Sequence, residues 1–186
     1  MTIASLVDAA IAFSRDHQAW VPALVFVLGL LESLAFLSIV VPSSVILLSI
    51  ASLFGAAGLR FEPLVIAGGL GASLGYAISY WLGLYFQADI LRIWPFSRHP
   101  AMVERAERFF RRFGVLSVFL GHFFGPVRAV IPVLAGIANM RAVPFQIANV
   151  PSGFLWAVLV MGPGYFATSS STLAPFWNTL RSWIGG

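Results

Sequence analysis

The sequence predicts an all-α polytopic membrane protein made of two inverted repeats. Each repeat is a re-entrant helical hairpin followed by a transmembrane helix, and an amphipathic cytoplasmic helix joins the two. Of the 186 residues, 59% are hydrophobic and 10% are charged, whereas a soluble domain has about 25% charged residues. Four long apolar stretches follow one another, and prolines and ionisable residues interrupt the first and the third. Lipid is therefore the expected solvent.

Length and charge narrow the function classes. The length suits a single domain over 1–186. The absence of cysteine excludes disulfides, thiolate metal sites and thiol nucleophiles. The net charge of +4 comes entirely from arginine, and six of the eleven arginines lie within 92–112, between two apolar regions. This clustering predicts a cytoplasmic loop under the positive-inside rule rather than a nucleic-acid surface.

The elements are expected in a regular order. Residues 1–19 lack a basic leader region, so we expect an interfacial helix and no cleaved signal peptide. Apolar stretches near 20 residues long are single membrane spans. The expected segments are hairpin 20–59, span 63–86, basic loop 87–112, hairpin 113–140, span 143–167 and interfacial tail 168–186.

The third stretch contains two expected helix breaks. Pro126 and Pro132 each remove a backbone donor, and Gly125 precedes a proline, which disfavours helical geometry. Arms of about 11 to 14 residues would each cross only part of a ~30 Å core. Arg112 and Arg141 flank the stretch, so both ends are expected on the cytoplasmic side. A re-entrant hairpin meets these conditions, and one long kinked span is the alternative.

The first stretch contains Glu32 and Pro42. It fits either a second re-entrant hairpin or two ordinary spans that turn at 42–44, although the second span would then have only about 15 residues. Paired, proline-interrupted segments in the two halves are typical of inverted-repeat transporters with a binding site at the midplane.

The basic loop is expected to contain an amphipathic helix from Pro100 to just before Gly114, lying on the inner membrane surface. Glu104 with Arg108 and Glu107 with Arg111 are spaced for i,i+4 ion pairs. The alternative is a solvated linker helix. The expected apolar stripe comprises Met102, Ala106, Phe109 and Phe113.

Small residues recur every four positions in span 63–86, so another helix can approach closely. This stripe is interpreted as packing, with a gating surface as the alternative. Its members are Ala67, Gly71, Gly75, Ser79 and Gly83.

Glu32 and Arg128 are the strongest site candidates. A charged side chain at the bilayer centre costs about 2.5–3.5 kcal/mol on insertion scales, so such residues face a partner or a cavity. A purely structural ion pair is the alternative. The arginine fork suits phosphate, and a desolvated Glu32 could exchange protons.

Further polar residues accompany this pair. His122 could contribute to proton coupling or contact a phosphate, or it could be a neutral histidine bonded to free backbone. Ser43 and Ser44 could bind a ligand or cap the hairpin. Asn149, with Gln146, could face the site or bridge two helices. Enzyme motifs and metal-ligand clusters are absent from the sequence, so we expect no enzyme activity, cofactor or metal.

A family resemblance supports this layout. The run GHFFGPVR at 121–128, followed by Pro132, Ala135-Gly136 and Met140, resembles the signature of the DedA membrane proteins, also called the VTT or SNARE-associated domain. The resemblance extends over about residues 20–167. Further matching positions are Glu32 with Pro42, Gly71 with Gly75 and Tyr76, and Phe145, Asn149, Gly153 and Trp156.

The resemblance implies two opposed re-entrant hairpins and transport of lipids or lipid phosphates, in some members coupled to protons. It also implies a set of two acids and two arginines. Glu32 and Arg128 match one of each, whereas Ser44 stands at the second acid position and His122 at the first arginine position. This departure puts the proton coupling in question more than the fold.

The expected function is a flippase or scramblase of the bacterial inner membrane that moves undecaprenyl phosphate or a phospholipid. Arg128 would hold the phosphate, helped by the N-termini of return arms starting near Val127 and Ser43. Expected partners are membrane lipids and protons, without nucleic acid, and the sequence is compatible with a homo-oligomer. A proton-coupled transporter of ions or drugs and a non-transporting scaffold are the alternatives.

The topology can be tested with single cysteines, since the chain has none of its own. Cysteines at 112 and 141 should react with an impermeant reagent from the same, cytoplasmic side. Labelling from opposite sides would instead favour the kinked span.

Overall fold

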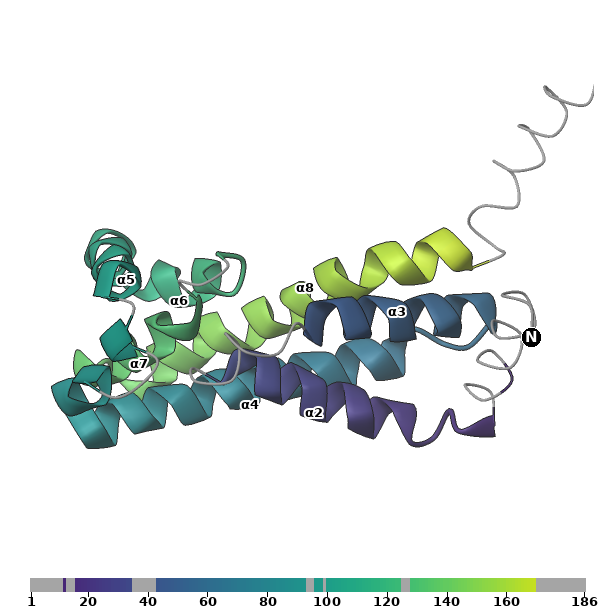
Figure 1. The fold of residues 1–186 in the computed structure, drawn as a ribbon, viewed down its shortest axis with the longest axis horizontal. Coiled ribbons are helices and arrows are strands. Elements are labelled where there is room, and N and C mark those ends of the chain that lie inside the picture. The colour runs from purple at the N-terminus through teal and green to yellow at the C-terminus, as the bar shows by residue number, and fades with distance from the viewer. Residues whose placement is uncertain are drawn as a thin grey trace, which may run out of the picture.

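The computed structural model describes residues 12, 16–34, 43–92, 96–98, 100–124 and 128–169. This part of the chain is entirely helical, without strands, as expected (Figure 1). The helices are α2 (Val21–Ser33), α3 (Ser43–Ala56), α4 (Glu62–Phe86), α5 (Pro100–Phe113), α6 (Val115–Gly121), α7 (Ile131–Ile137) and α8 (Ala142–Thr168), with short 3-10 helices η1 (Gln87–Arg92) and η2 (Phe96–Arg98).

Two long apolar helices form the centre of the molecule, and both match the spans predicted from the sequence. Helix α4 has 25 residues and α8 has 27. At 1.5 Å per residue they measure about 37 and 40 Å, more than a ~30 Å bilayer core. Helix α8 continues through Pro151 and Pro163.

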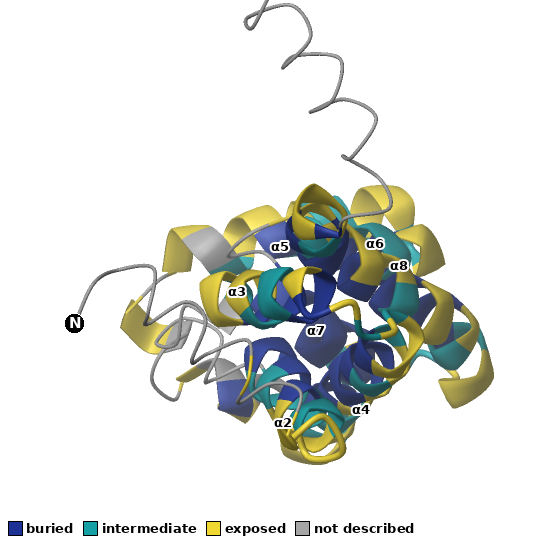
Figure 2. Cartoon of the chain, turned by 90° about the vertical axis from the view of Figure 1, so that its right-hand side faces the viewer, coloured by how far each residue is buried: buried dark blue, intermediate teal, exposed yellow. Residues whose placement is uncertain are grey.

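The short helices are distributed evenly over this central pair. Helix α2 packs on α4 and α3 packs on α8, while α6 packs on α8 and α7 packs on α4. Figure 1 shows α2 and α3 along one half of the long axis and α5, α6 and α7 along the other half. Figure 2 shows the buried faces turned inward between the helices and the exposed faces outward. Two hydrophobic cores result, one in each half.

Glycines let these helices approach to backbone contact. A Cβ on Gly83 of α4 would clash with the carbonyl of Val133 in α7, and one on Gly136 of α7 would clash with the carbonyl of Tyr80 in α4. A Cβ on Gly55 of α3 would likewise clash with the Tyr165 carbonyl of α8, and one on Gly164 of α8 would clash with the Leu48 carbonyl of α3. On the other face of α4, Gly71 lies against the backbone of α2. The packing interpretation of the small-residue stripe is therefore correct.

The turns after α3 and α7 have the same hydrogen bonds, 81 positions apart. Gly58 has φ 69° and Asn139 has φ 52°, a left-handed conformation that ends a helix. A tyrosine of a long helix then donates to the next carbonyl: Tyr165 to Leu59 and Tyr80 to Met140. The shared backbone bonds run from Gly58 to Gly55 and from Leu59 to Phe54, and likewise from Asn139 to Gly136 and from Met140 to Ala135.

Helix α5 has the predicted bounds and both predicted ion pairs. Glu104 pairs with Arg108 at 2.5 Å and Glu107 pairs with Arg111 at 3.3 Å. Ala106 is fully buried, but Phe113 is exposed at the end of the helix. The buried stripe is therefore centred on Ala106 and does not reach Phe113. The side chain of Met102 lies outside the described residues.

The third stretch differs from the expectation in its arms. Helices α6 and α7 have seven residues each, shorter than the predicted arms. Pro132 occupies the first turn of α7, where its missing donor is harmless, so it starts a helix instead of breaking one. The predicted breaks at Pro42, Gly125 and Pro126, most of the predicted interfacial helix in 1–19 and the tail from 170 onward lie outside the described residues.

A pair of glycine substitutions tests the close packing. Gly71→Ala should destabilise the protein by about 1–3 kcal/mol because α2 must move away from α4. In Gly162→Ala the new Cβ would meet only the Phe166 ring, at 3.7 Å, so this control should be neutral or stabilising. Thermal unfolding in detergent measures both. Equal losses would contradict the packing described here.

Candidate functional site

One buried ion pair joins the two halves of the molecule. Glu32 is in the last turn of α2, and Arg128 is in the turn that precedes α7. Arg128 Nη1 is 3.3 Å from Glu32 Oε1, with only 11% and 6% of the two side chains exposed. Arg128 Nη2 also donates to the backbone carbonyl of Glu32 at 2.6 Å. The guanidinium therefore holds both the carboxylate and the end of α2.

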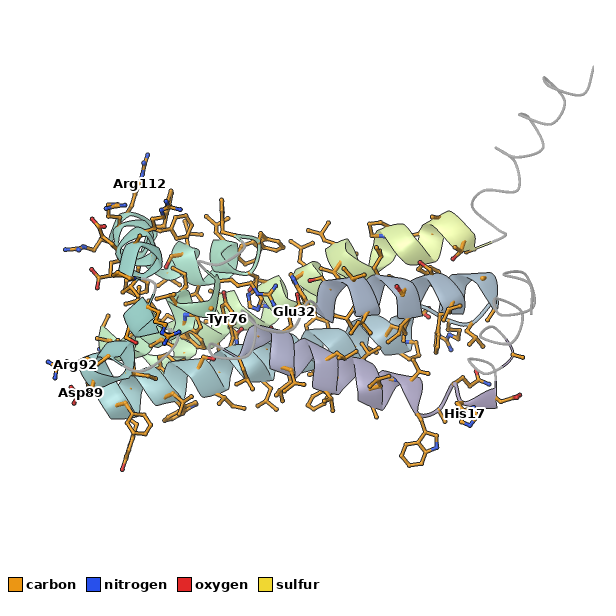
Figure 3. All side chains as sticks on the ribbon, viewed as in Figure 1. His17, Glu32, Tyr76, Asp89, Arg92 and Arg112 are labelled. Carbon is orange, nitrogen blue, oxygen red and sulfur yellow. The ribbon has the colours of Figure 1, made fainter. Side chains whose placement is uncertain are left out.

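This pair lies midway along the molecule. Figure 3 places Glu32 and Tyr76 near the middle of the long axis, and Asp89, Arg92 and Arg112 at one end. The exposed side chains along α4 and α8 between the ends are apolar. They include Ile66, Leu70, Leu74, Leu155, Val158 and Leu159.

Two further side chains position the charges. The Arg128 guanidinium lies over the Trp156 ring of α8, 5.1 Å from its centroid, a cation–π contact. Ser44, in the first turn of α3, donates to Glu32 Oε1. Helices α2, α3 and α8 and the turn before α7 thus all contribute to one site.

His122 ends the α6 segment and is fully buried. Its Nδ1 is 2.8 Å from Ser152 Oγ on α8. Its ring stacks on Tyr76 of α4, with centroids 3.7 Å apart and planes at 24°. His122 therefore contacts both long helices.

Asn149 bridges the long helices, the second of the two interpretations made from sequence. Its Nδ2 donates to the Ser73 carbonyl on α4 at 2.9 Å and to Gln146 Oε1 at 2.9 Å. Ser152 Oγ in turn donates to the Asn149 carbonyl at 2.9 Å. The polar groups of Gln146, Asn149 and Ser152 on α8 thus form one continuous line, which His122 of the α6 segment extends.

Several polar atoms of this region have no hydrogen-bond partner. In the part of the chain that the structure describes, buried unpartnered side-chain atoms occur only in and beside this site. Most buried polar groups in proteins are paired, so such a concentration indicates a place for water or a ligand. The atoms are Glu32 Oε2, Ser33 Oγ, Tyr76 OH, His122 Nε2, Arg128 Nε and Asn149 Oδ1.

Sequence reasoning found part of this site. The structure brings Glu32, Arg128 and Ser44 into direct contact, and it places His122 and Asn149 in the adjoining polar line. The side chain of Ser43 lies outside the described residues. Sequence reasoning missed three partners: Trp156, Tyr76 and Ser152. Ser152 could have been found because it follows Asn149 by one helical turn and so shares its face.

The predicted starts of the two helices near the site are only partly correct. Helix α3 begins at Ser43, as predicted. Helix α7 begins at Ile131 instead of Val127, three residues after Arg128, and it has only seven residues. Any anion at this site therefore depends on the Arg128 side chain rather than on the α7 dipole. Among the described residues, no group of three His, Asp or Glu side chains could hold a metal.

Relatives of the chain are membrane proteins. Inner membrane protein YabI of Escherichia coli is 29% identical over 144 residues, which cover 77% of this chain and 56% of YabI. Inner membrane protein YqjA of the same organism is 26% identical over 162 residues, 84% of this chain and 72% of YqjA. Uncharacterized membrane protein Mb2670 of Mycobacterium bovis is 33% identical over 174 residues, 90% of this chain and 78% of that protein.

The chain thus spans little more than half of YabI. No solved structure matches it. The VTT domain family matches residues 41–166, about two thirds of the chain, including α3, α4 and every helix from α5 to α8. This match confirms the resemblance read from the GHFFGPVR run: the chain is a membrane protein that belongs to the VTT domain family, the DedA family.

Proposed function

We propose that this protein is a flippase- or scramblase-type transporter that moves a phosphate-bearing lipid, such as undecaprenyl phosphate or a phospholipid, across a bacterial inner membrane. One observation carries the proposal: a buried arginine is paired with a carboxylate, yet its Nε and one carboxylate oxygen remain unpartnered. A phosphate, like a carboxylate, can accept two parallel hydrogen bonds from an arginine, and its remaining oxygens can accept more. When no cargo is bound, the Glu32 carboxylate therefore occupies the place beside Arg128 that a phosphate would take.

The proposed architecture is an inverted repeat. Hairpin 1 (α2 and α3) with α4 forms the first repeat, and hairpin 2 (α6 and α7) with α8 forms the second. In each, the first arm packs on its own long helix and the second arm packs on the other long helix. The turns after α3 and α7, which have the same hydrogen bonds, align the two repeats with an offset of 81 residues. A two-fold relation between the repeats explains both observations.

In the membrane, α4 and α8 would span the core and both hairpins would be re-entrant. Their arms are too short to cross: α3 has 14 residues and α7 has seven. Backbone that turns at this depth is tolerated only inside protein or beside a cavity, and the described ends of these arms meet at the ion pair. Helix α5, with its arginines, would lie on the cytoplasmic surface.

Proton exchange on Glu32 would control access to Arg128. Removing one member of a buried ion pair costs about 3–5 kcal/mol because the other charge is left uncompensated. Protonation of Glu32 therefore favours entry of a new anion, and departure of that anion favours return of the carboxylate. His122, between Ser152 and Tyr76, would adjust the protonation of the site.

A proton-coupled transporter of organic cations is the second candidate. Trp156 and Tyr76 place aromatic faces in the site, and such faces bind organic cations. Here Glu32 would be the cargo ligand and Arg128 its displaced partner. A scaffold without transport is a weaker proposal, because it gives no role to the unpartnered polar atoms. We propose no enzyme activity.

Charge removal tests the pair. Glu32→Gln and Arg128→Gln should each lower the unfolding temperature, because each leaves one charge buried alone, and the double variant should recover much of the loss. Thermal unfolding in detergent measures all three. Glu104→Gln is the control, because the exposed ion pair between Glu104 and Arg108 contributes less than about 1 kcal/mol to the free energy of unfolding. Strictly additive losses would mean that the charges do not stabilise each other.

Lipid protection and transport test the cargo. Short-chain phosphatidic acid should raise the unfolding temperature, phosphatidylcholine of equal chain length should not, and Arg128→Ala should abolish the effect. Arg112→Ala, which removes an exposed arginine, should keep it. In liposomes, Arg128→Lys should slow movement of a labelled lipid phosphate, because lysine cannot bind in bidentate fashion. Equal protection by a cationic drug, unchanged by Arg128→Ala, would favour the second candidate.

A further inference from the structure

We propose that α6, the first arm of hairpin 2, is the gate of the site and that it swings about Gly114, while α2, the first arm of hairpin 1, stays fixed to α4. This inference rests on the proposed transport function, and it names the element that opens the path. Three observations carry it: unequal packing of the two first arms, the polar contact of α6 with α8, and the backbone at the start of α6.

The first arm of hairpin 1 is clamped. Helix α2 lies against α4 at backbone distance, because Gly71 and Gly75 of α4 have no side chains to separate them. A Cβ at Gly71 would clash with the Phe26 carbonyl, and one at Gly75 would lie 2.5 Å from the Leu30 carbonyl. Such close packing leaves no alternative position for α2 without loss of the whole interface.

The first arm of hairpin 2 meets a different surface. The repeat spacing of 81 residues relates three glycines of α4 to three positions of α8. Gly68, Gly71 and Gly75 correspond to Asn149, Ser152 and Trp156. The hydrogen bond between His122 Nδ1 and Ser152 Oγ links α6 to α8 here. Asn149 Oδ1 and His122 Nε2 are buried beside it without partners. The face of α4 that contacts α2 is therefore lined by glycines, whereas the face of α8 that contacts α6 is lined by polar side chains that lack some of their hydrogen-bond partners.

The start of α6 is a hinge. Gly114 joins α5 to α6 with φ 53° and ψ −125°, a conformation that is open to glycine and unfavourable for other residues. A Cβ at Gly114 would meet nothing within 4 Å, so packing does not require the glycine. The positive φ is then the reason for the glycine, and it marks the point where the direction of the chain changes between α5 and α6.

Movement of α6 would open the site on its α8 side. His122 would leave Ser152 and Tyr76 and expose the polar line on α8. The second arm, α7, would stay in place because Gly83 and Gly136 hold it to α4. Arg128, next to α7, would then remain at a fixed depth while α6 moves away from the site.

Two spin-label pairs, each joining a first arm to its own long helix, test this in a chain without native cysteine. Cysteines replace Leu24 and Tyr85 to report on α2 against α4, and Leu116 and Phe166 to report on α6 against α8. All four side chains are exposed, and 85 and 166 are 81 positions apart. Double electron–electron resonance in nanodiscs gives the distance distribution of each pair, with and without dihexanoyl phosphatidic acid.

The expected result is one narrow distance for 24–85 in both conditions, and for 116–166 a broad or two-peaked distribution that shifts with phosphatidic acid. Movement in 24–85 alone, or equally narrow distributions in both pairs, would overturn the proposal. Dihexanoyl phosphatidylcholine is the lipid control and should shift neither pair.

A hinge variant gives a second measurement. Gly114→Ala should narrow the 116–166 distribution and slow lipid movement in liposomes several-fold. Gly58→Ala is the matched control, because Gly58 also has a positive φ and open space around its Cβ position. It should leave the 116–166 distribution unchanged. A lipid transporter with an immobile α6 refutes the gate alone, whereas a mobile α6 without lipid transport refutes the proposed function alone.

Discussion

The structure depends on the need to bury Glu32 and Arg128 together. Neither charge is tolerable alone in an apolar interior, and the two come from different halves of the chain. The end of α2 and the turn before α7 must therefore meet at the same level. Arg128 also binds the backbone at the end of α2, which fixes the two segments to each other as well as their charges. Trp156 and Ser44 then complete an enclosure made by four elements.

Such an enclosure needs helices that come very close together. Leucine and phenylalanine side chains would hold α7 and α3 away from the long helices, and the pair could not close. The glycines at 55, 83, 136 and 164 remove that separation at two equivalent interfaces. Van der Waals packing of backbone on backbone is the main attraction available between helices in lipid. The polar centre is therefore supported by apolar contacts on both sides.

Much of this arrangement was predictable from the sequence because it depends on local signals. The bounds of α4 and α8 follow from apolar length, and the ion pairs of α5 follow from i,i+4 spacing. Glu32 and Arg128 were evident because isolated charges in apolar stretches need a partner. Trp156, Tyr76 and Ser152 were missed as site residues because only the packing of distant helices shows what they face. The start of α7 was misplaced because Pro132 fits a helix start as well as a helix break.

The exchange of second arms between the halves has a consequence for biogenesis. Helix α3 finds its main partner in α8, and the Leu59 carbonyl receives its hydrogen bond from Tyr165, 106 residues later. At about 5–20 residues per second, a ribosome needs roughly 5–20 s to deliver that partner. During this interval α3 is too short to cross the bilayer and lacks its main packing partner. Helix α3 can therefore take its final position only after α8 has been synthesised.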